Sequence, residues 1–124
     1  MIMTTKIAIA GAKGRMGQNL IRSGLSNSHT DVVGIFDISE IDKDFLDEMH
    51  LSHDVATNRE NSFDAADVII DFTSPKALFA FTESAVASKT SLVVGTTGLE
   101  EQHFNLLKQT GQSTKVFYAP NMSF

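Results

Sequence analysis

The run Gly11–Gly17 has glycine at its first, fourth and seventh positions and directly follows the apolar run Ile7–Ala10. Glycine adopts backbone conformations closed to other residues, so a strand can turn sharply there and a phosphate can approach the main chain. The helix expected next would offer free N–H groups and a partial positive charge to an anion. These features predict a pyrophosphate site, although a tight strand–helix turn without a ligand needs the same glycines.

The spacing of these glycines is looser than the dinucleotide-binding fingerprint G-x-G-x-x-G, because Lys13 stands where the second glycine is expected. A Walker-type phosphate loop is excluded, since no Gly-Lys-Ser or Gly-Lys-Thr follows the turn. A methyltransferase would share the glycine turn and a following acid, so these motifs alone leave the chemistry open.

A second candidate, Asp37, follows the apolar run Val32–Phe36 and comes roughly 20 residues after the glycine turn, where a dinucleotide-binding fold places an acid that accepts hydrogen bonds from the adenosine ribose. This acid would repel a 2′-phosphate, and the next residues, Ile38–Glu40, offer no cation. We therefore expect NAD(H) in preference to NADP(H), unless Lys43 reaches back to the acid. The alternative is that Asp37 merely begins a turn.

Three further turns follow apolar runs. In Phe72–Thr73 the aromatic ring could belong to the core, and the threonine could touch a ribose of the cofactor. The turn Gly95–Thr97 could form a backbone rim for nicotinamide or simply start a capped helix, with Thr97 as part of the cap. In the last turn, Ala119–Met122, the amide of Asn121 could orient a neighbouring group.

The elements that must position these turns are five short apolar runs alternating with segments of helical period. The predicted strands are Lys6–Ala10, Val32–Phe36, Val68–Phe72, Ser91–Val94 and Lys115–Tyr118. Their nearly continuous hydrophobicity indicates parallel strands covered on both faces. The pattern predicts a doubly wound, mainly parallel α/β sheet of the Rossmann type, in which ligands bind beyond the carboxyl ends of the strands.

Three helices are predicted between these strands, each burying one face. The residues expected to face the core are Met16, Leu20, Ile21 and Leu25 in the first helix, Leu78, Phe81, Ala85 and Val86 in the second, and Phe104 and Leu107 in the third. The second helix opens at Ser74–Pro75, and the third at Thr97 with the spacing of a capping box. The polar segment Asp37–Asn61 is expected to hold one short helix, and a short edge strand at His53–Thr57.

The composition describes a single globular domain over residues 1–124, with 42% hydrophobic and 20% charged residues. A formal net charge of −5 argues against nucleic acid or an acidic membrane surface as partner. There is no cysteine and the four histidines are scattered, so no metal site is expected. No run resembles a membrane span or a signal peptide, which makes the cytoplasm the expected location.

Four motifs resemble the N-terminal half of dihydrodipicolinate reductase, also called 4-hydroxy-tetrahydrodipicolinate reductase. They are residues 10–17 (AGAKGRMG), 70–75 (IDFTSP), 94–98 (VGTTG) and 119–123 (APNMS). The motifs occur in the right order over the whole chain, whereas residues 39–61 carry little signal. The resemblance implies an NAD(P)H-dependent oxidoreductase of lysine and diaminopimelate biosynthesis, which reduces the product of the preceding synthase step to tetrahydrodipicolinate.

The resemblance also implies which residues contact the cofactor. They are Gly11, Ala12, Lys13, Gly14, Arg15, Met16, Gly17, Asp37, Phe72, Thr73, Gly95, Thr96, Thr97, Ala119, Pro120, Asn121 and Met122. Family members that use NADPH well often have a basic residue after the acid, and Ile38 stands there, which again favours NAD(H).

The family's catalytic segment, a histidine pair with a lysine and an Asp-Ala-Pro-Ser-Gly-Thr stretch that binds two substrate carboxylates, does not occur in these 124 residues. We therefore expect no catalytic residue here, and a chain that ends at the hinge to a second domain. That domain would bind the small dicarboxylate substrate and form a homotetramer. By itself the chain is expected to be a monomer that binds the nicotinamide dinucleotide weakly and catalyses nothing measurable.

Two other classes of function stay open. A nucleotide-sensing regulatory module would bind the same ligand without chemistry and would have no substrate domain downstream. Another two-domain amino-acid dehydrogenase, acting on aspartate or homoserine, would share the fold, but the G-T-T-G and P-N-M-S motifs argue against it.

Overall fold

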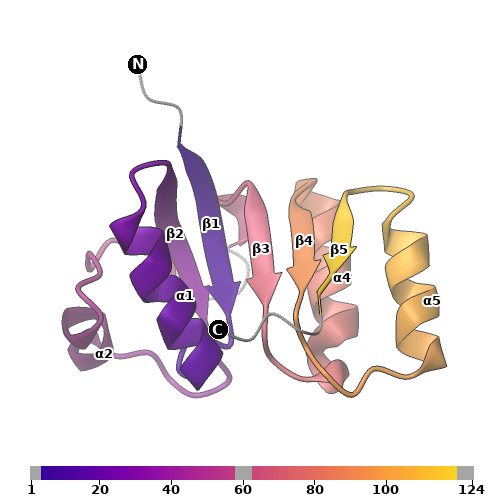
Figure 1. Ribbon diagram of the computed structural model, residues 1–124, viewed down its shortest axis with the longest axis horizontal. Helices are drawn as coiled ribbons and strands as arrows, with labels where there is room; N and C mark the ends of the chain where they lie inside the picture. The colour runs from indigo at the N-terminus through magenta and orange to yellow at the C-terminus, as the bar shows by residue number, and fades with distance from the viewer. Residues whose placement is uncertain (1–3, 58–62, 120–124) are drawn as a thin grey trace.

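Five parallel strands form the central sheet of the protein in a computed structural model that describes residues 4–57 and 63–119 (Figure 1). The strands are β1 (Thr5–Ala10), β2 (Thr30–Phe36), β3 (Val68–Asp71), β4 (Ser91–Val94) and β5 (Val116–Tyr118). The helices are α1 (Arg15–Ser26), α2 (Lys43–Glu48), α4 (Leu78–Ser88) and α5 (Glu101–Thr110). The strand order β2-β1-β3-β4-β5 confirms the predicted doubly wound sheet.

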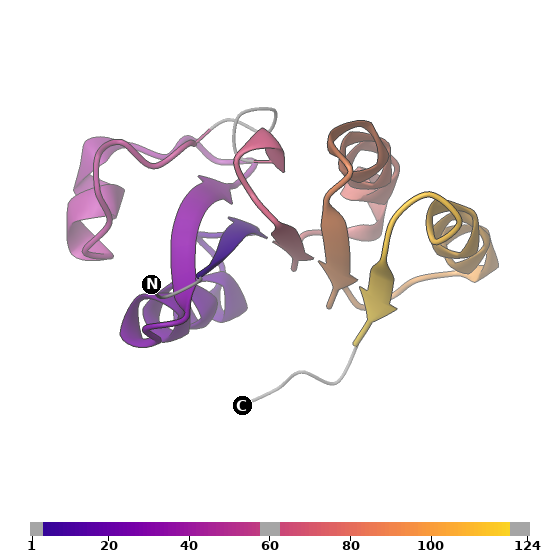
Figure 2. The same ribbon diagram turned by 90° about the horizontal axis from the view of Figure 1, so that it is seen from above.

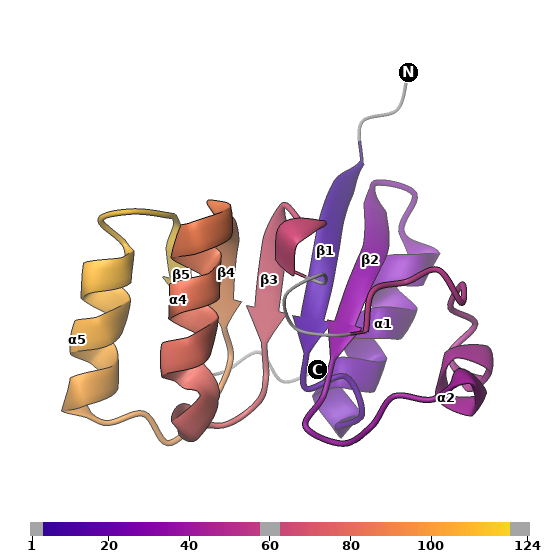
Figure 3. The same ribbon diagram turned by 180° about the vertical axis from the view of Figure 1, so that it is seen from behind.

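Helices cover both faces of the sheet. Figure 1 shows α1 in front of β1 and β2, whereas the view from behind in Figure 3 shows α4 in front of β4 and β5, with α5 beside β5. The view from above in Figure 2 separates these two layers, with the sheet between them. All strands point the same way, so their carboxyl ends form one edge of the sheet.

The interior strand β1 shows why the apolar runs are nearly continuous. Ile7 and Ile9 belong to a buried cluster with α1 and α2, while Ala8 and Ala10 belong to a second cluster with α4 and α5. Successive side chains point to opposite faces of a strand, and here both faces are covered. Because neither face of such a strand is exposed to solvent, its sequence does not alternate between apolar and polar residues.

In α1 one of the predicted core residues is wrong. The helix buries Gly17, Ile21 and Gly24, and a Cβ atom on Gly24 would lie 2.9 Å from Cγ2 of Val32 in β2. The helix therefore lies close to the sheet at Gly24. Leu25, one position further around the helix, is 44% exposed and is not part of the core.

The second predicted helix begins with a 3-10 turn at Pro75–Ala77, and α4 follows from Leu78. Its buried stripe contains Thr82 and not Val86, which is 38% exposed. The positions that face the core follow the i, i+3, i+4, i+7 spacing from Leu78, and Val86 falls at the edge of that stripe.

The third predicted helix starts later than expected. Gly98 has φ of +80°, so the turn after β4 continues past it, and α5 begins at Glu101. Glu100 is the N-cap, and its main-chain N–H donates to Nδ1 of His103 at 2.9 Å to complete a capping box. Thr97 does not cap the helix.

Of the two core residues predicted for the third helix, one is confirmed. Leu107 is buried, but Phe104 is 43% exposed and packs edge-on against the ring of Tyr118 in β5, with ring centroids 5.2 Å apart. Phe104 covers the edge of the sheet instead of entering the core.

The segment after β2 contains the short helix that was predicted, α2, with Phe45 and Leu46 in the core. The edge strand predicted at His53–Thr57 is wrong, because pairing is limited to one parallel bridge between Ala56 and Gly34. Within the described residues no helix is long and apolar enough to cross a membrane.

Candidate functional site

The glycine turn takes its shape from close contacts between main-chain atoms. Gly11 has φ of +87°, and a Cβ atom there would lie 2.7 Å from the carbonyl oxygen of Phe72. The N–H groups of Gly11 and Ala12 both donate to the carbonyl of Phe36 at the end of β2, at 2.8 and 3.0 Å. Only glycine fits the first position, which confirms the sharp turn expected there.

The other two glycines of the turn have different roles. A Cβ atom on Gly17 would collide with the carbonyl oxygen of Gly11, so Gly17 lets α1 pack against the turn. A Cβ atom on Gly14 would meet only that same oxygen, at 3.5 Å, and otherwise enter open space. Gly14 is also the N-cap of α1, where no side chain caps the helix. Its free first-turn N–H groups and the open space beside Gly14 fit a phosphate.

Asp37 follows β2, and two main-chain groups fix its carboxylate. Oδ2 accepts from the N–H of Lys13 at 2.9 Å, and Oδ1 accepts from the N–H of Ser39 at 3.0 Å. The acid therefore begins a turn, as in the alternative prediction, and it also lies beside the glycine turn. Each carboxylate oxygen keeps lone-pair capacity for a further donor.

A cation does reach the loop after Asp37, but it belongs to Lys13 and not to Lys43. The ammonium of Lys13 donates to the carbonyl oxygen of Glu40 at 3.0 Å and lies 5.9 Å from the centre of the Phe45 ring. The sequence carries no signal for this placement, because the acceptor is a main-chain carbonyl.

These turns surround a cavity of about 420 Å³. The predicted residues that line it are Gly11, Gly14, Asp37, Phe72 and Thr73. Apolar side chains complete the wall, including Ala77 and Ala80 near the start of α4 and Ile38, which is 97% exposed. The cavity lies at the carboxyl ends of β2, β1 and β3, where a doubly wound sheet binds its ligand.

The turns after β3 and β4 are tied to each other. A Cβ atom on Gly95 would collide with the ring of Phe72, so this glycine makes room for the ring. Gly95 N–H donates to the carbonyl of Asp71 at 2.9 Å, and the buried hydroxyl of Thr96 donates to that same oxygen at 3.3 Å. Phe72 thus serves the packing between the two turns as well as lining the cavity.

The other predicted contacts among the described residues do not line this cavity. Arg15 is exposed and Met16 is half-buried in the first turn of α1, whereas the Ala12 side chain is buried in the core. Thr97 is exposed beyond β4, and Ala119 donates its N–H to the carbonyl of Val94 at 2.8 Å. The three other predicted contacts, Pro120, Asn121 and Met122, lie outside the described residues.

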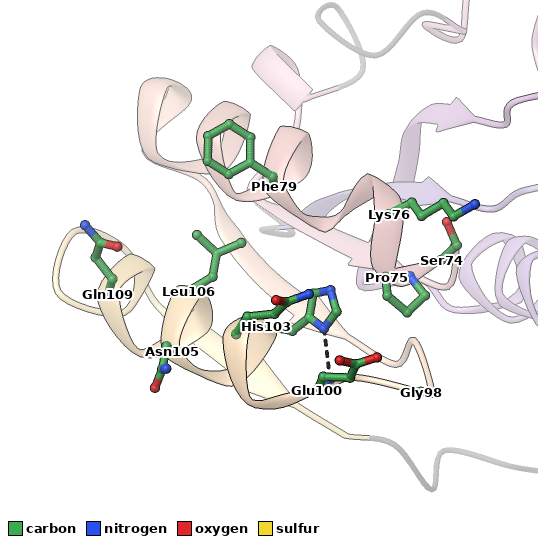
Figure 4. A pocket seen from close by; sticks show the side chains of 11 residues that line it. Ser74, Pro75, Lys76, Phe79, Gly98, Glu100, His103, Asn105, Leu106 and Gln109 are labelled. Atoms are coloured by element: carbon green, nitrogen blue, oxygen red, sulfur yellow. Dashed lines mark hydrogen bonds between the residues drawn. The ribbon is translucent and has the colours of Figure 1, made fainter.

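A larger hollow of about 1050 Å³ lies between the start of α4 and α5, and Figure 4 shows it from close by. Phe79 and Leu106 line it from the two helices, and His103 faces it while accepting from the N–H of Glu100. None of the predicted site residues lines this hollow. The smaller cavity is therefore the candidate site.

One acid in this region has an altered ionisation. Burial raises the pKa of Asp71 above its usual range, against the opposing effect of hydrogen bonds from Thr73. Among the described residues, no three histidine, aspartate or glutamate side chains gather as a metal site.

Comparison with protein families gives a match over residues 5–122 to the model described as "Dihydrodipicolinate reductase, N-terminus". The chain is similar to the 4-hydroxy-tetrahydrodipicolinate reductases of Sulfurovum sp. (strain NBC37-1), with 33% identity over 119 residues, and of Burkholderia lata, with 36% over 125. These matches cover 96% and 95% of this chain but 45% and 46% of those proteins. The chain thus spans less than half the length of the curated relatives it matches.

Among solved structures, the chain is similar to a dipicolinate-bound dihydrodipicolinate reductase from Paenisporosarcina sp. TG-14. The TM-score is 0.72 at 26% identity, covering 96% of this chain and 48% of that one. A likeness to GenD2 from gentamicin A biosynthesis, solved in complex with NAD, has a TM-score of 0.76 at 15% identity and covers 98% and 36% of the two chains. The second likeness shows the fold alone.

Proposed function

The chain belongs to the dihydrodipicolinate reductase family, whose N-terminal region it matches, and from this premise we propose that it binds NAD(H) in the 420 Å³ cavity. In the proposed role it holds the hydride donor of a 4-hydroxy-tetrahydrodipicolinate reductase. In this proposal, the groups that protonate the substrate and bind its two carboxylates lie outside these 124 residues. The chain alone is therefore expected to bind cofactor as a monomer and to reduce nothing.

The order of the turns along the sheet edge carries the proposal. Asp37 follows β2, the glycine turn follows β1, Thr73 follows β3 and Gly95 follows β4, and these strands are neighbours in that order. Adjacent strands lie about 4.8 Å apart, so the four turns form a row. A dinucleotide laid along the row places its adenosine ribose at Asp37, its pyrophosphate at the glycine turn and its nicotinamide half at Thr73 and Gly95.

The pyrophosphate position in this row, at the glycine turn, is formed by main-chain groups. In the proposed complex the N-terminal N–H groups of α1 receive phosphate oxygens through the space that Gly14 leaves open. Arg15, exposed in the first turn, adds a positive charge beside them. When bound, the reduced nicotinamide supplies the hydride, and the protein supplies its position.

The acid at the adenosine end of the row, Asp37, favours NAD(H). Asp37 would accept hydrogen bonds from ribose hydroxyls but would repel a 2′-phosphate. The nearby ammonium of Lys13 is held by the carbonyl of Glu40, so it does not neutralise the acid. We propose NAD(H) as the preferred cofactor and NADP(H) as the weaker one.

Further features of the complete protein follow from the same family. The proposed substrate is a small dicarboxylate, bound by a second domain that also forms the homotetramer. The proposed setting is the cytoplasm. Neither nucleic acid nor membrane is a proposed partner of a chain with a net charge of −5.

A glycine substitution tests the proposal directly. Gly14→Ala places a methyl group in the space reserved for phosphate, at a residue with φ of −75° that tolerates alanine. NADH is titrated with the protein, and binding is followed by NADH fluorescence. The affinity of the variant is expected to be lower by about tenfold or more, because roughly one or two hydrogen bonds to a charged group are lost. The melting temperature should stay unchanged.

Gly111→Ala is the matched control for this experiment. Gly111 also has ordinary dihedral angles, with φ of −62°, and ends α5 away from the cavity. The control is expected to bind NADH like the unaltered chain. Equal NADH affinity in the Gly14→Ala variant would contradict a phosphate site at this turn.

A further inference from the structure

Asp71 ends β3 in the middle of the sheet, and its side chain is completely buried. Its Oδ1 atom accepts two hydrogen bonds from a single residue, Thr73: one from the main-chain N–H at 2.8 Å and one from the hydroxyl at 2.6 Å. The other oxygen, Oδ2, is buried and has no hydrogen-bond partner within the described part of the chain. The carboxyl therefore accepts from both hydrogen-bond donors of Thr73, the main-chain N–H and the hydroxyl.

These two bonds determine the direction of the Thr73 hydroxyl. An ionised carboxylate has no hydrogen to donate, so Oδ1 accepts both of these bonds. The Thr73 hydroxyl therefore points its hydrogen at Oδ1. The lone pairs of Thr73 Oγ1 are then all that this oxygen can offer to a ligand.

Thr73 stands at the wall of the 420 Å³ cavity. Its Cγ2 atom lies 3.5 Å from the place that a Cβ atom on Gly11 would occupy, so the residue is next to the glycine turn. It is half-buried, in contrast to the fully buried Asp71 behind it. The acid is shielded from a ligand, whereas the threonine that it orients can reach one.

We propose that Asp71 is a positioning residue that makes Thr73 Oγ1 a hydrogen-bond acceptor toward the cavity, for a ligand that carries a donor at that point. The inference rests on the proposed function and deepens it. By the order of the turns, the donor is a hydroxyl of the second ribose or the carboxamide N–H of nicotinamide. A phosphate oxygen, which only accepts, finds no partner in this atom.

Binding of two ligands to a small set of variants tests this inference. NADH carries the nicotinamide half, and ADP lacks it. Asp71→Asn keeps the shape of the side chain but allows its amide to donate to Thr73, and Thr73→Val removes the hydroxyl at equal size. Each of these two variants is expected to bind NADH about tenfold more weakly, because one hydrogen bond to the ligand is lost. ADP affinity should stay within about twofold, since ADP does not reach Thr73.

Three comparisons separate positioning from a general structural effect. Thr73→Ser keeps the hydroxyl and should bind NADH like the unaltered chain. The double variant Asp71→Asn/Thr73→Val should bind no worse than Thr73→Val, because the acid acts only through the hydroxyl. Thr90→Val removes a buried hydroxyl at the other end of the sheet and should leave both affinities unchanged.

Several results would overturn the inference. One such result is unchanged NADH affinity in both Asp71→Asn and Thr73→Val, and another is an equal loss of affinity for ADP and for NADH. Either would show that Thr73 is not an acceptor for the nicotinamide half. A Thr73→Ser variant as weak as Thr73→Val would do the same, so this pair can overturn the inference even if Asp71→Asn does not fold. An unaltered chain that binds neither ligand would refute the proposed function itself.

Discussion

The ionisation of the Asp71 carboxyl is expected to make the stability of the protein depend on pH. Burial raises its pKa above the ordinary value of 3.8, although hydrogen bonds from Thr73 oppose the shift. The folded state therefore binds this proton more tightly than the unfolded chain does. The resulting stabilisation is complete below pH 3.8 and is lost as the pH rises through the pKa of the folded state.

A comparison with Asp71→Asn measures this effect, because asparagine does not titrate. The free energy of unfolding of the unaltered chain, relative to that of the variant, is expected to fall as the pH rises from about 3.8 toward neutrality. Urea unfolding at a series of pH values gives the difference. A difference that rises with pH would mean that the pKa of Asp71 is lowered in the folded protein.

The residues of the site were predictable where a single local cause determines them. Gly11 needs a positive φ and Gly17 must leave room for the nearby carbonyl oxygen of Gly11, and the sequence shows these glycines as a spaced pattern. The bonds of Lys13 to Glu40 and of Asp71 to Thr73 were not predictable in the same way. Lys13 finds a carbonyl that any residue type would provide, and the burial of Asp71 depends on both neighbouring strands.

Among the elements, the turn after β4 and the turn after β3 form one packed unit. The ring of Phe72 occupies the space where a Cβ atom of Gly95 would be. Gly95→Ala should therefore destabilise the fold by about 1–3 kcal/mol through overpacking. Phe72→Leu removes the atoms that collide, so its cost should be smaller in the Gly95→Ala background than in the unaltered chain.

A double-mutant cycle on these two positions makes the prediction quantitative. The four free energies of unfolding, from urea titrations, are expected to give an interaction energy of roughly 0.5–3 kcal/mol, as for residues in direct contact. Additive effects would indicate that Phe72 has another position available and does not couple the two turns.

The prediction of the elements succeeded for the five strands of the sheet, failed for the edge strand expected at His53–Thr57, and was weaker for the helices. A parallel strand buried on both faces is a continuous apolar run, so all five strands appear in the sequence. The faces and ends of helices depend on tertiary contacts. Close approach at Gly24 places Leu25 outside the core, and the positive φ of Gly98 delays α5 until Glu101.

For the whole molecule, the proposed ligand contacts the ends of four strands, which makes binding a source of global stability. A ligand that binds only the folded state stabilises it by about 2.7 kcal/mol at a concentration one hundred times its Kd. NADH is therefore expected to raise the melting temperature of the chain progressively with concentration. The Gly14→Ala variant should show a much smaller shift at the same NADH concentrations.

The same measurement with NADPH tests the cofactor preference across the whole row of turns. At equal concentration NADPH should raise the melting temperature less than NADH, because the 2′-phosphate meets the carboxylate of Asp37. An equal or larger shift with NADPH would contradict this preference and would mean that the ammonium of Lys13 leaves the carbonyl of Glu40 to pair with the phosphate. In that case Lys13→Met should reduce the NADPH shift and leave the NADH shift in place.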